Sequence, residues 1–425
     1  MSTYTDPPKP AFRLSQLIYD TRYRSITIQV VALVLIAIGL WWLGRNTVEN
    51  LEALGKDFDF GFLGNAAGYD INQMLISYDN QMSHGRAALV GIMNTLLVAF
   101  LGCITATVLG VIIGVLRLSK NWVVSRLMAV YVEGFRNVPL LLWIILIFAV
   151  MTESTPQPRD FRGDDPAATM LFADSVAVTN RGVYIPRIGF TNSLTGDDVI
   201  AGQEALTAVS QGGIDWLVII GTLIASLAVI RVIRKRADRI QEKTGDRPTT
   251  WWQQLAILII PVAIVLAFLG ATIVQPFLKG FNFTDGIHLR NSLIALWVAL
   301  SLYTSAFIAK NVRAGIMAVS AGQTEAANAL GLRGNRTMSL VVLPQAMRII
   351  IPPLISQYLN LTKNSSLALA VGYMDVRATL GGITINQTGR ELEGMLLLGG
   401  FYLILSLLIS MIMNIYNNST KLEER

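Results

Sequence analysis

Few residues of this chain have a type and spacing that could do chemistry. The chain has one cysteine, Cys103, and two histidines, His84 and His288, which are too few for an internal disulfide or a metal cluster. It has no G-x-x-x-x-G-K-S/T loop for nucleotide phosphates, and no Ser/His/Asp set, paired aspartates, H-E-x-x-H or G-x-S-x-G pattern in a context that supports catalysis. We therefore expect no catalytic residue, no cofactor and no metal, and we expect that the chain is not an enzyme.

One polar cluster interrupts an apolar stretch and is a candidate site for a charged solute. It consists of Lys363, Asn364, Ser365 and Ser366. A charge at mid-membrane costs at least about 2.5–3.5 kcal/mol, so we expect Lys363 to face the protein interior or a water-filled cavity. Its ammonium group would suit a carboxylate, and the whole cluster would then line a pathway. The alternative, that Lys363 only pairs with an acid or a carbonyl to hold the bundle, remains open.

A second segment, residues 320–344, has the signals of a helix followed by a sharp turn. Ser320 and Gln323 fit a capping box at the start of a helix. Glu325 would lie in the first turn, where a negative charge suits the helix dipole. Gly331 can take the left-handed conformation that ends a helix.

The rest of this segment predicts a surface that a partner can approach closely. Ala326, Ala327 and Ala329 form helices well and have little bulk. A second short helix, capped by Asn335, would stop before Pro344. We expect a helix, a turn and another helix.

Apolar runs long enough to cross a membrane must position these two segments. Of the residues, 53% are hydrophobic and only 15% are charged, whereas soluble proteins carry about 25% charged residues. A spanning helix needs about 20 mostly apolar residues. Eight runs qualify, at 26–43, 89–116, 138–151, 214–233, 255–274, 291–308, 349–371 and 395–415. Pro352 and Pro353 should break a turn of the seventh run and free carbonyl groups near the polar cluster.

The distribution of basic residues predicts the orientation of the spans. With the N-terminus inside, the inside segments hold roughly twice as many Lys and Arg as the outside ones. Both termini and residues 311–343 would then lie inside, and residues 152–213 outside. The net charge of +6 does not indicate nucleic-acid binding, because the basic residues sit between apolar runs and form no stripe on one domain.

The spacing within residues 320–344 resembles a known motif. Glu325-Ala326-Ala327, three residues, Gly331, nine residues, Val341, one residue and Leu343-Pro344 resembles the EAA motif of binding-protein-dependent ABC importers. Isoleucine is commoner at the position of Val341. The resemblance implies a coupling helix that docks on a separate ATPase. The coupling residues that it implies are Gln323, Glu325, Ala326, Ala327, Gly331, Leu343 and Pro344.

Further segments resemble the polar amino-acid subfamily of these importers. They are Gly91-Ile-Met-Asn-Thr-Leu96, Glu133-Gly-Phe-Arg-Asn-Val-Pro-Leu140, Lys363-Asn-Ser-Ser-Leu367, and Gly315-Ile with Gln323 further on. They cover residues 89–151 and 291–415, which supply the five spans of the subfamily's core. The additional spans resemble the long-form permeases of general L-amino-acid transporters of Gram-negative bacteria.

The resemblance implies an all-α integral membrane protein with a type I ABC importer fold and about eight transmembrane helices. Residues 1–88 would form the cytoplasmic N-terminus, the first span and a periplasmic loop, and residues 416–425 a cytoplasmic tail. Residues 89–415 would form the permease domain, with a periplasmic insertion at 152–213 and two inserted helices at 214–274.

The resemblance also implies a function and partners. The chain would be the permease subunit of an importer that translocates amino acids across the bacterial inner membrane. Its partners would be a cytoplasmic ABC ATPase dimer, a second permease subunit, a periplasmic amino-acid-binding protein and the lipid bilayer. The long forms usually pair two different permeases, but this sequence leaves open whether the second permease is identical. An ion-driven secondary amino-acid transporter is the alternative, although no inverted repeat and no acid at the centre of a well-defined span favours it.

Overall fold

The computed structural model describes residues 20–53, 55, 57–163, 165–194 and 213–419. Residues 1–19 and 420–425, within the expected cytoplasmic ends, and residues 195–212 of the expected periplasmic insertion lie outside the described residues. The chain divides into two units, residues 1–62 and 63–425. In the first, helix α2 (Thr21–Ala53) contains the expected first span and is apolar enough to cross a membrane.

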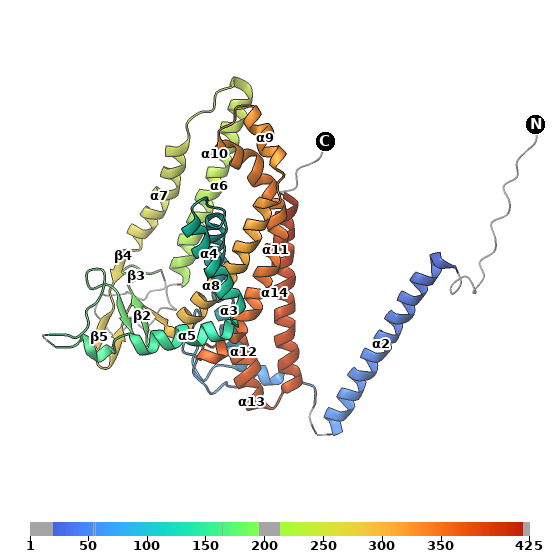
Figure 1. Cartoon of the computed structure of the whole chain (residues 1–425). Helices are drawn as coiled ribbons and strands as arrows, with labels where there is room; N and C mark the ends of the chain where they lie inside the picture. Colours follow the sequence, from blue (N-terminus) through green and yellow to red (C-terminus); the bar gives the residue numbers. More distant parts are fainter. Residues whose placement is uncertain (1–19, 54, 56, 164, 195–212, 420–425) are drawn as a thin grey trace, which may run out of the picture. The chain divides into compact units, whose positions relative to one another are not determined.

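The second unit is built around helix α8 (Asn291–Met317), which α3 (His84–Leu116), α4 (Trp122–Asn137), α5 (Leu140–Ser154) and α11 (Leu343–Asn364) contact (Figure 1). Helix α14 (Glu391–Ser419) packs on α11. The largest apolar cluster runs through this bundle and includes Leu296, Leu300, Ile308 and Ile350. Buried leucine and isoleucine on α8 thus hold the helices that position both candidate segments.

Small residues allow α3 and α8 to approach each other closely. A Cβ atom placed on Gly110 would lie 2.6 Å from Cβ of Ile308, and one on Gly114 would lie 2.8 Å from Cβ of Val312. Neither distance leaves room for a side chain, so the two glycines determine how closely the helices pack.

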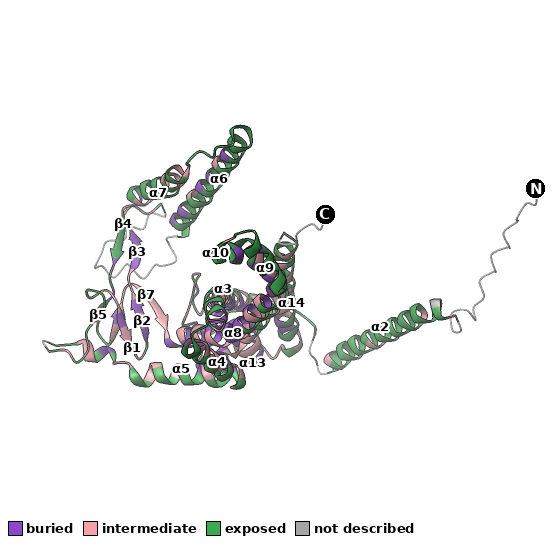
Figure 2. Cartoon of the chain, turned by 45° about the horizontal axis from the view of Figure 1, so that its top comes forward, coloured by how far each residue is buried: buried purple, intermediate pink, exposed green. Residues whose placement is uncertain are grey.

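Helices α6 (Gly213–Thr244) and α7 (Trp251–Phe268) form a hairpin beside the bundle. They pack on each other, and Figure 2 shows that most of their surface is exposed. Among the described residues, α6 buries Asp215, Ile219, Ser226, Ile230 and Ala237, whereas α7 buries none. The apolar outer faces of both helices fit contact with lipid.

Short antiparallel strands lie at one end of the hairpin and of the bundle. Strand β2 (Gly182–Ile185) pairs with β1 (Ala177–Thr179) and with β7 (Ile287–Arg290), Val183 lying opposite Val178 and Leu289. Strand β3 (Arg187–Phe190) pairs with β4 (Ala271–Val274), Arg187 lying opposite Val274. Strand β5 (Phe277–Lys279) pairs with β6 (Asn282–Thr284). The segments before α6 and after α7 thus form one small β-rich region.

The described residues confirm a helical chain with many spans, and they correct two of the expected runs. Seven helices are long and apolar enough to cross a membrane, or eight if the bent pair α4 and α5 is one span. That pair bends by 105° between Asn137 and Leu140. The third run, 138–151, is therefore mostly α5, the second half of a bent pair, and not a span by itself. Pro139, between the two helices, lacks an N–H group and does not continue the first helix. The fifth run ends early, because Gly270 has a φ of 62° and the chain then enters β4.

Candidate functional site

The first candidate helix, α9 (Ala321–Ala329), begins where the sequence predicts, but not with the expected cap. Ser320 is its N-cap residue and makes no side-chain capping bond. The amide oxygen of Gln323 instead accepts a hydrogen bond from Nε2 of Gln345 at 3.2 Å. Glu325 lies beyond the first turn, which contains no acid, so its expected dipole contact is also wrong.

The turn after α9 forms as predicted. Gly331 has a φ of 73°. Its N–H donates to the carbonyl of Asn328 at 2.9 Å, and the N–H of Leu332 donates to the carbonyl of Ala327 at 3.1 Å. These two bonds are the Schellman arrangement, which satisfies the last carbonyl groups of a helix through a left-handed residue.

The second helix of the segment is longer than predicted. Helix α10 (Gly334–Thr337) continues through the π-helical segment Met338–Val342 directly into α11. Its N-cap residue is Arg333, not Asn335. Pro344 lies just after the π-helical segment, in the first turn of α11, and does not stop the helix. The segment is therefore the beginning of a span.

Most of the expected coupling residues are exposed in the structure. Ala327 is buried, which fixes α9 on the protein. The side chains of Gln323, Glu325 and Ala326 are exposed, as are Gly331, Leu343 and Pro344. The contact between Gln323 and Gln345 holds the start of α9 beside the start of α11. A groove of about 310 Å³ runs behind α9, lined by Ile316, Val319, Thr324, Asn328, Gly334, Thr337, Met338 and Val342.

The polar cluster lies where α11 ends. Lys363 is exposed in the last turn of α11, and its ammonium group makes no hydrogen bond or ion pair with the part of the chain that the structure describes. Asn364 is half-buried, and Ser365 is buried and donates to the carbonyl of Thr362 at 2.7 Å. The carbonyl of Ser366 accepts a bond from Nη1 of Arg377 at 3.1 Å.

The backbone around this cluster differs from the expectation in one respect. Helix α11 continues through Pro352 and Pro353, so they do not break it. The interruption comes later, where the chain tightens into the 3₁₀ helix Ser365–Val371 and leaves it at Gly372, with a φ of 71°. The tighter helix directly follows Lys363 and Asn364.

The sequence does not predict the polar contacts that fix the next segment on α3. Nδ2 of Asn94 donates to the carbonyls of Gln73 and Met374, both at 2.8 Å. The hydroxyl of Tyr373 donates to the carbonyl of Asn94 at 3.1 Å. Asn94 lies within the Gly91–Leu96 segment that resembles the subfamily, but that resemblance does not predict its hydrogen-bond partners. These bonds fix the chain just beyond the polar cluster.

A buried carboxyl group lies beside these contacts. Asp375 is 1% exposed, and its Oδ1 accepts a bond from the N–H of Ala378 at 2.9 Å. Burial raises the pKa of Asp375 to about 6, because the charged form loses its hydration there. It caps the short helix α12 (Val376–Ala378), a structural role that accounts for its position.

Comparisons with known proteins fit this geometry. The family model described as "Binding-protein-dependent transport system inner membrane component" matches residues 248–421, which include both candidate segments. The Glutamate/glutamine/aspartate/asparagine transport system permease protein BztB of Rhodobacter capsulatus is 56% identical, over 100% of both chains. The General L-amino acid transport system permease protein AapQ of Rhizobium johnstonii is 40% identical, over 96% of this chain and 94% of its own.

A third relative agrees with these two. The Putative amino-acid ABC transporter permease protein YhdX of Escherichia coli is 40% identical, over 95% of each chain. These matches support the importer prediction and not the ion-driven alternative. The chain belongs to the family of binding-protein-dependent transport system inner membrane components, and it is a multi-pass permease subunit of that family.

Proposed function

We propose that the chain moves amino acids inward across the bacterial inner membrane, coupled through α9 to a separate cytoplasmic ATPase. The observation that carries this proposal is the exposed surface of α9, held on the protein by Ala327 and ended by the turn at Gly331. The sequence has no phosphate-binding loop, so the energy would come from another chain. The names of the three relatives support amino acids as the substrate class.

Coupling would work as a rigid connection. The ATPase dimer would close on ATP and move the exposed surface formed by Gln323, Glu325, Ala326, Gly331, Leu343 and Pro344. Because α10 and the π-helical segment continue into α11 without a break, that movement would pass along α11 to the polar cluster at its other end.

The substrate pathway would follow Lys363, Asn364, Ser365 and Ser366. The exposed ammonium group of Lys363 forms no ion pair with a carboxylate among the described residues. It is therefore free to meet the carboxylate of an amino acid. A second permease subunit, identical or different, would cover this side, and a periplasmic binding protein would deliver the substrate.

A reconstituted system tests this function. The permease would be purified with its ATPase, second permease and binding protein and placed in liposomes with ATP inside. With the binding protein outside the liposomes, we expect the amino acids that it carries to stimulate ATP hydrolysis and to accumulate inside. Uptake that follows an imposed ion gradient and ignores ATP would contradict the proposal.

The proposed topology places both termini and α9 in the cytoplasm, and the region from residue 152 to 213 in the periplasm. In a Cys103→Ala background, single cysteines at the exposed positions Thr169 and Ser339 should react from opposite sides of the membrane. A membrane-impermeant thiol reagent added to intact spheroplasts should label the T169C variant only. Labelling of the S339C variant under the same conditions would reverse the topology. The proposed domain boundaries, with a permease domain at 89–415 and inserted helices at 214–274, depend on this topology.

Lys363→Met should lower uptake by more than about tenfold, because a hydrogen bond to a charged group contributes about 1.5–3 kcal/mol. Asn364→Ala should lower it less, since its amide is neutral. Transport and substrate-stimulated ATP hydrolysis would be measured together for each variant. Unchanged uptake and substrate preference in both would exclude the cluster as a substrate site, whereas failed assembly would assign Lys363 a structural role.

A further inference from the structure

One end of α6 carries a row of basic side chains that the proposed transport cycle does not use. They recur every four residues, at Arg231, Lys235, Arg239 and Lys243, and all four are exposed. Positions four apart lie on one face of a helix. Ile230 and Ala237, which α6 buries, lie on the opposite face. The row therefore points away from the rest of the hairpin.

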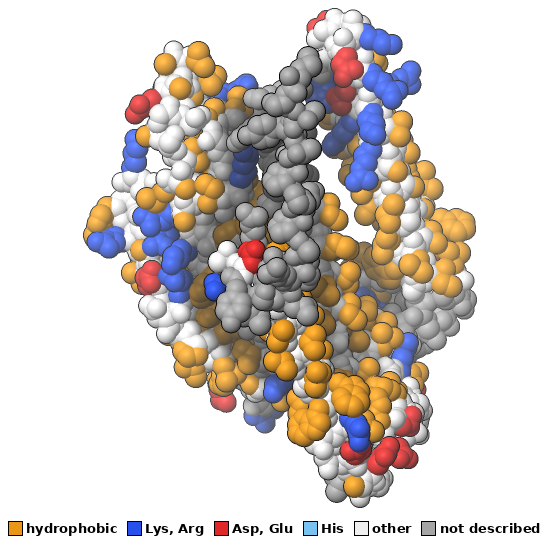
Figure 3. Space-filling view, turned by 90° about the vertical axis from the view of Figure 1, so that its right-hand side faces the viewer, with side chains coloured by type: hydrophobic (Ala, Val, Ile, Leu, Met, Phe, Trp, Pro, Cys, Tyr) orange, Lys and Arg blue, Asp and Glu red, His pale blue; other side chains and the backbone are white. Residues whose placement is uncertain are grey.

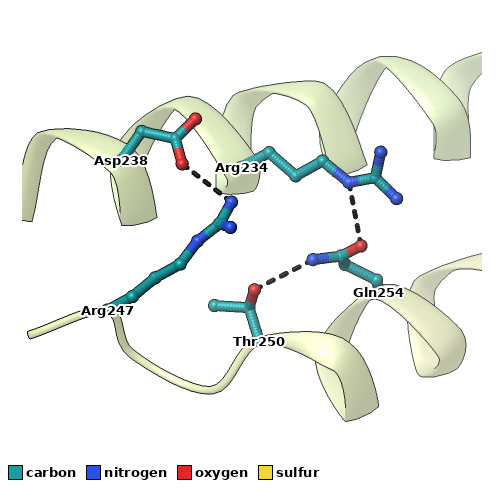
Figure 4. Close-up of polar contacts among 5 residues, drawn as sticks. All are labelled: Arg234, Asp238, Arg247, Thr250 and Gln254. Carbon is teal, nitrogen blue, oxygen red and sulfur yellow. Dashed lines mark hydrogen bonds and ion pairs between the residues drawn. The ribbon is translucent and has the colours of Figure 1, made fainter. Parts of the chain in front are cut away.

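The turn between α6 and α7 is built from other charged side chains (Figure 4). Nη2 of Arg247 contacts Oδ1 of Asp238 at 2.8 Å. Nε of Arg234 donates to Oε1 of Gln254 at 2.9 Å, and Nε2 of Gln254 donates to Oγ1 of Thr250 at 2.9 Å. Arg234, Arg247 and Asp238 thus hold the turn against α6, and the basic row takes no part in it.

The charge of the row is not neutralised by the described part of the chain. None of its four side chains makes a hydrogen bond or ion pair there. Asp238 is already paired with Arg247, and Glu242 is the remaining acid on this part of α6. Like charges four residues apart repel each other and weaken a helix. An anion from outside the chain would remove that repulsion.

The depth of the row relative to the bilayer indicates which anion would bind it. The bond between Arg234 and Gln254 places Arg234 level with the start of α7, where Trp251 is 70% exposed and Trp252 is 56% exposed. Exposed tryptophans at a helix end mark the membrane interface. The upper right of Figure 3 shows the same division, with Lys and Arg side chains above a hydrophobic stretch.

Helix geometry then places the charges. At 1.5 Å per residue, Arg239 lies about 7 Å beyond Arg234, and the headgroup layer is about 5–7 Å thick. Side chains on a helix lean toward its N-terminus, which for this end of α6 is toward the membrane. The charges of Lys235 and Arg239 therefore fall within the headgroup layer, and that of Lys243 at its outer edge. Arg231 lies about 4.5 Å on the membrane side of Arg234, so its long side chain reaches the layer by extending back along the helix.

We propose that Arg231, Lys235, Arg239 and Lys243 form a binding site for the phosphate groups of anionic phospholipids, at the membrane interface that Trp251 and Trp252 mark. The site would belong to the inner leaflet and would hold the hairpin at a fixed depth beside the bundle.

Quenching of tryptophan fluorescence by brominated lipid tests this proposal. The full chain, assembled with its partner subunits, would be placed in nanodiscs with brominated phosphatidylglycerol or brominated phosphatidylcholine. The fluorescence of Trp251 and Trp252 is obtained by subtracting the fluorescence of a W251F/W252F variant from that of the unmodified chain. Each basic residue near a charged surface contributes about fivefold to binding. We expect the preference for phosphatidylglycerol to fall by at least about fivefold in a K235Q/R239Q/K243Q variant, and to persist in the charge-retaining control K235R/R239K/K243R.

Several results would overturn the site. The first is equal quenching by the two lipids in the unmodified chain, and the second is an unchanged preference in the glutamine variant. A preference abolished by inorganic phosphate at matched ionic strength would mean that the row binds free phosphate. If the glutamine variant loses its ATPase subunit in neutral-lipid nanodiscs and keeps its lipid preference, the row is a protein contact.

Discussion

Replacing Gly331 with valine should abolish transport while leaving the chain inserted in the membrane. The φ of 73° at this position places a β-branched side chain in a strained conformation. The strain costs about 1–3 kcal/mol, which shifts the equilibrium of the turn by about 5–150-fold. Loss of the turn would release the two backbone bonds that end α9 and reorient its exposed surface. Uptake and ATP hydrolysis should therefore become uncoupled, with basal ATP hydrolysis insensitive to substrate.

A matched control separates the turn from the bulk of the new side chain. Gly334 lies three residues further on, begins α10, is exposed and has no positive φ. No atom lies within 4 Å of a Cβ placed there. Gly334→Val should therefore keep most of the uptake. If both variants transport normally at normal expression, α9 does not couple the chain to its ATPase.

The structure explains why the turn was predictable and its caps were not. A glycine after a run of alanines predicts a left-handed helix end, because few other residues tolerate that conformation. Gln323 has an amide that can satisfy either its own backbone or a neighbour, and Gln345 of α11 is the neighbour that it contacts. That choice depends on tertiary packing, which a local pattern does not contain.

The spans and strands show the same limit. Apolar length alone predicts the helices, because lipid forces a spanning segment to satisfy its own backbone groups. Strands of three or four residues, such as β1 and β4, are too short to show an alternating pattern. Residues 271–274 therefore resemble the end of a span until β3 pairs with them. The bend before Leu140 has a visible cause in Pro139, but its angle depends on the packing around α8.

Gly110→Leu should prevent the chain from folding, because it separates α3 from α8. A Cβ at position 110 would lie 2.6 Å from Cγ2 of Ile308 and 3.0 Å from the carbonyl oxygen of Ser305. The isoleucine can shift only slightly in a close-packed core, and the carbonyl belongs to the helix backbone. Overpacking by one methyl group costs about 1–3 kcal/mol, so even Gly110→Ala should lower the thermal midpoint, and leucine should exceed what the bundle tolerates.

The measurement is the yield and thermal midpoint of the solubilised chain on size-exclusion chromatography. Gly399→Leu is the control, since Gly399 lies exposed on α14 and no atom approaches a Cβ there within 4 Å. It should leave both values near those of the unmodified chain. A Gly110→Leu variant that elutes as one sharp peak with an unchanged midpoint would show that α3 and α8 need not touch. The G-x-x-x-G spacing of Gly110 and Gly114 is common in membrane chains and predicts little alone. Ile308 and Val312 on the facing helix, brought there only by the fold, make it a close contact.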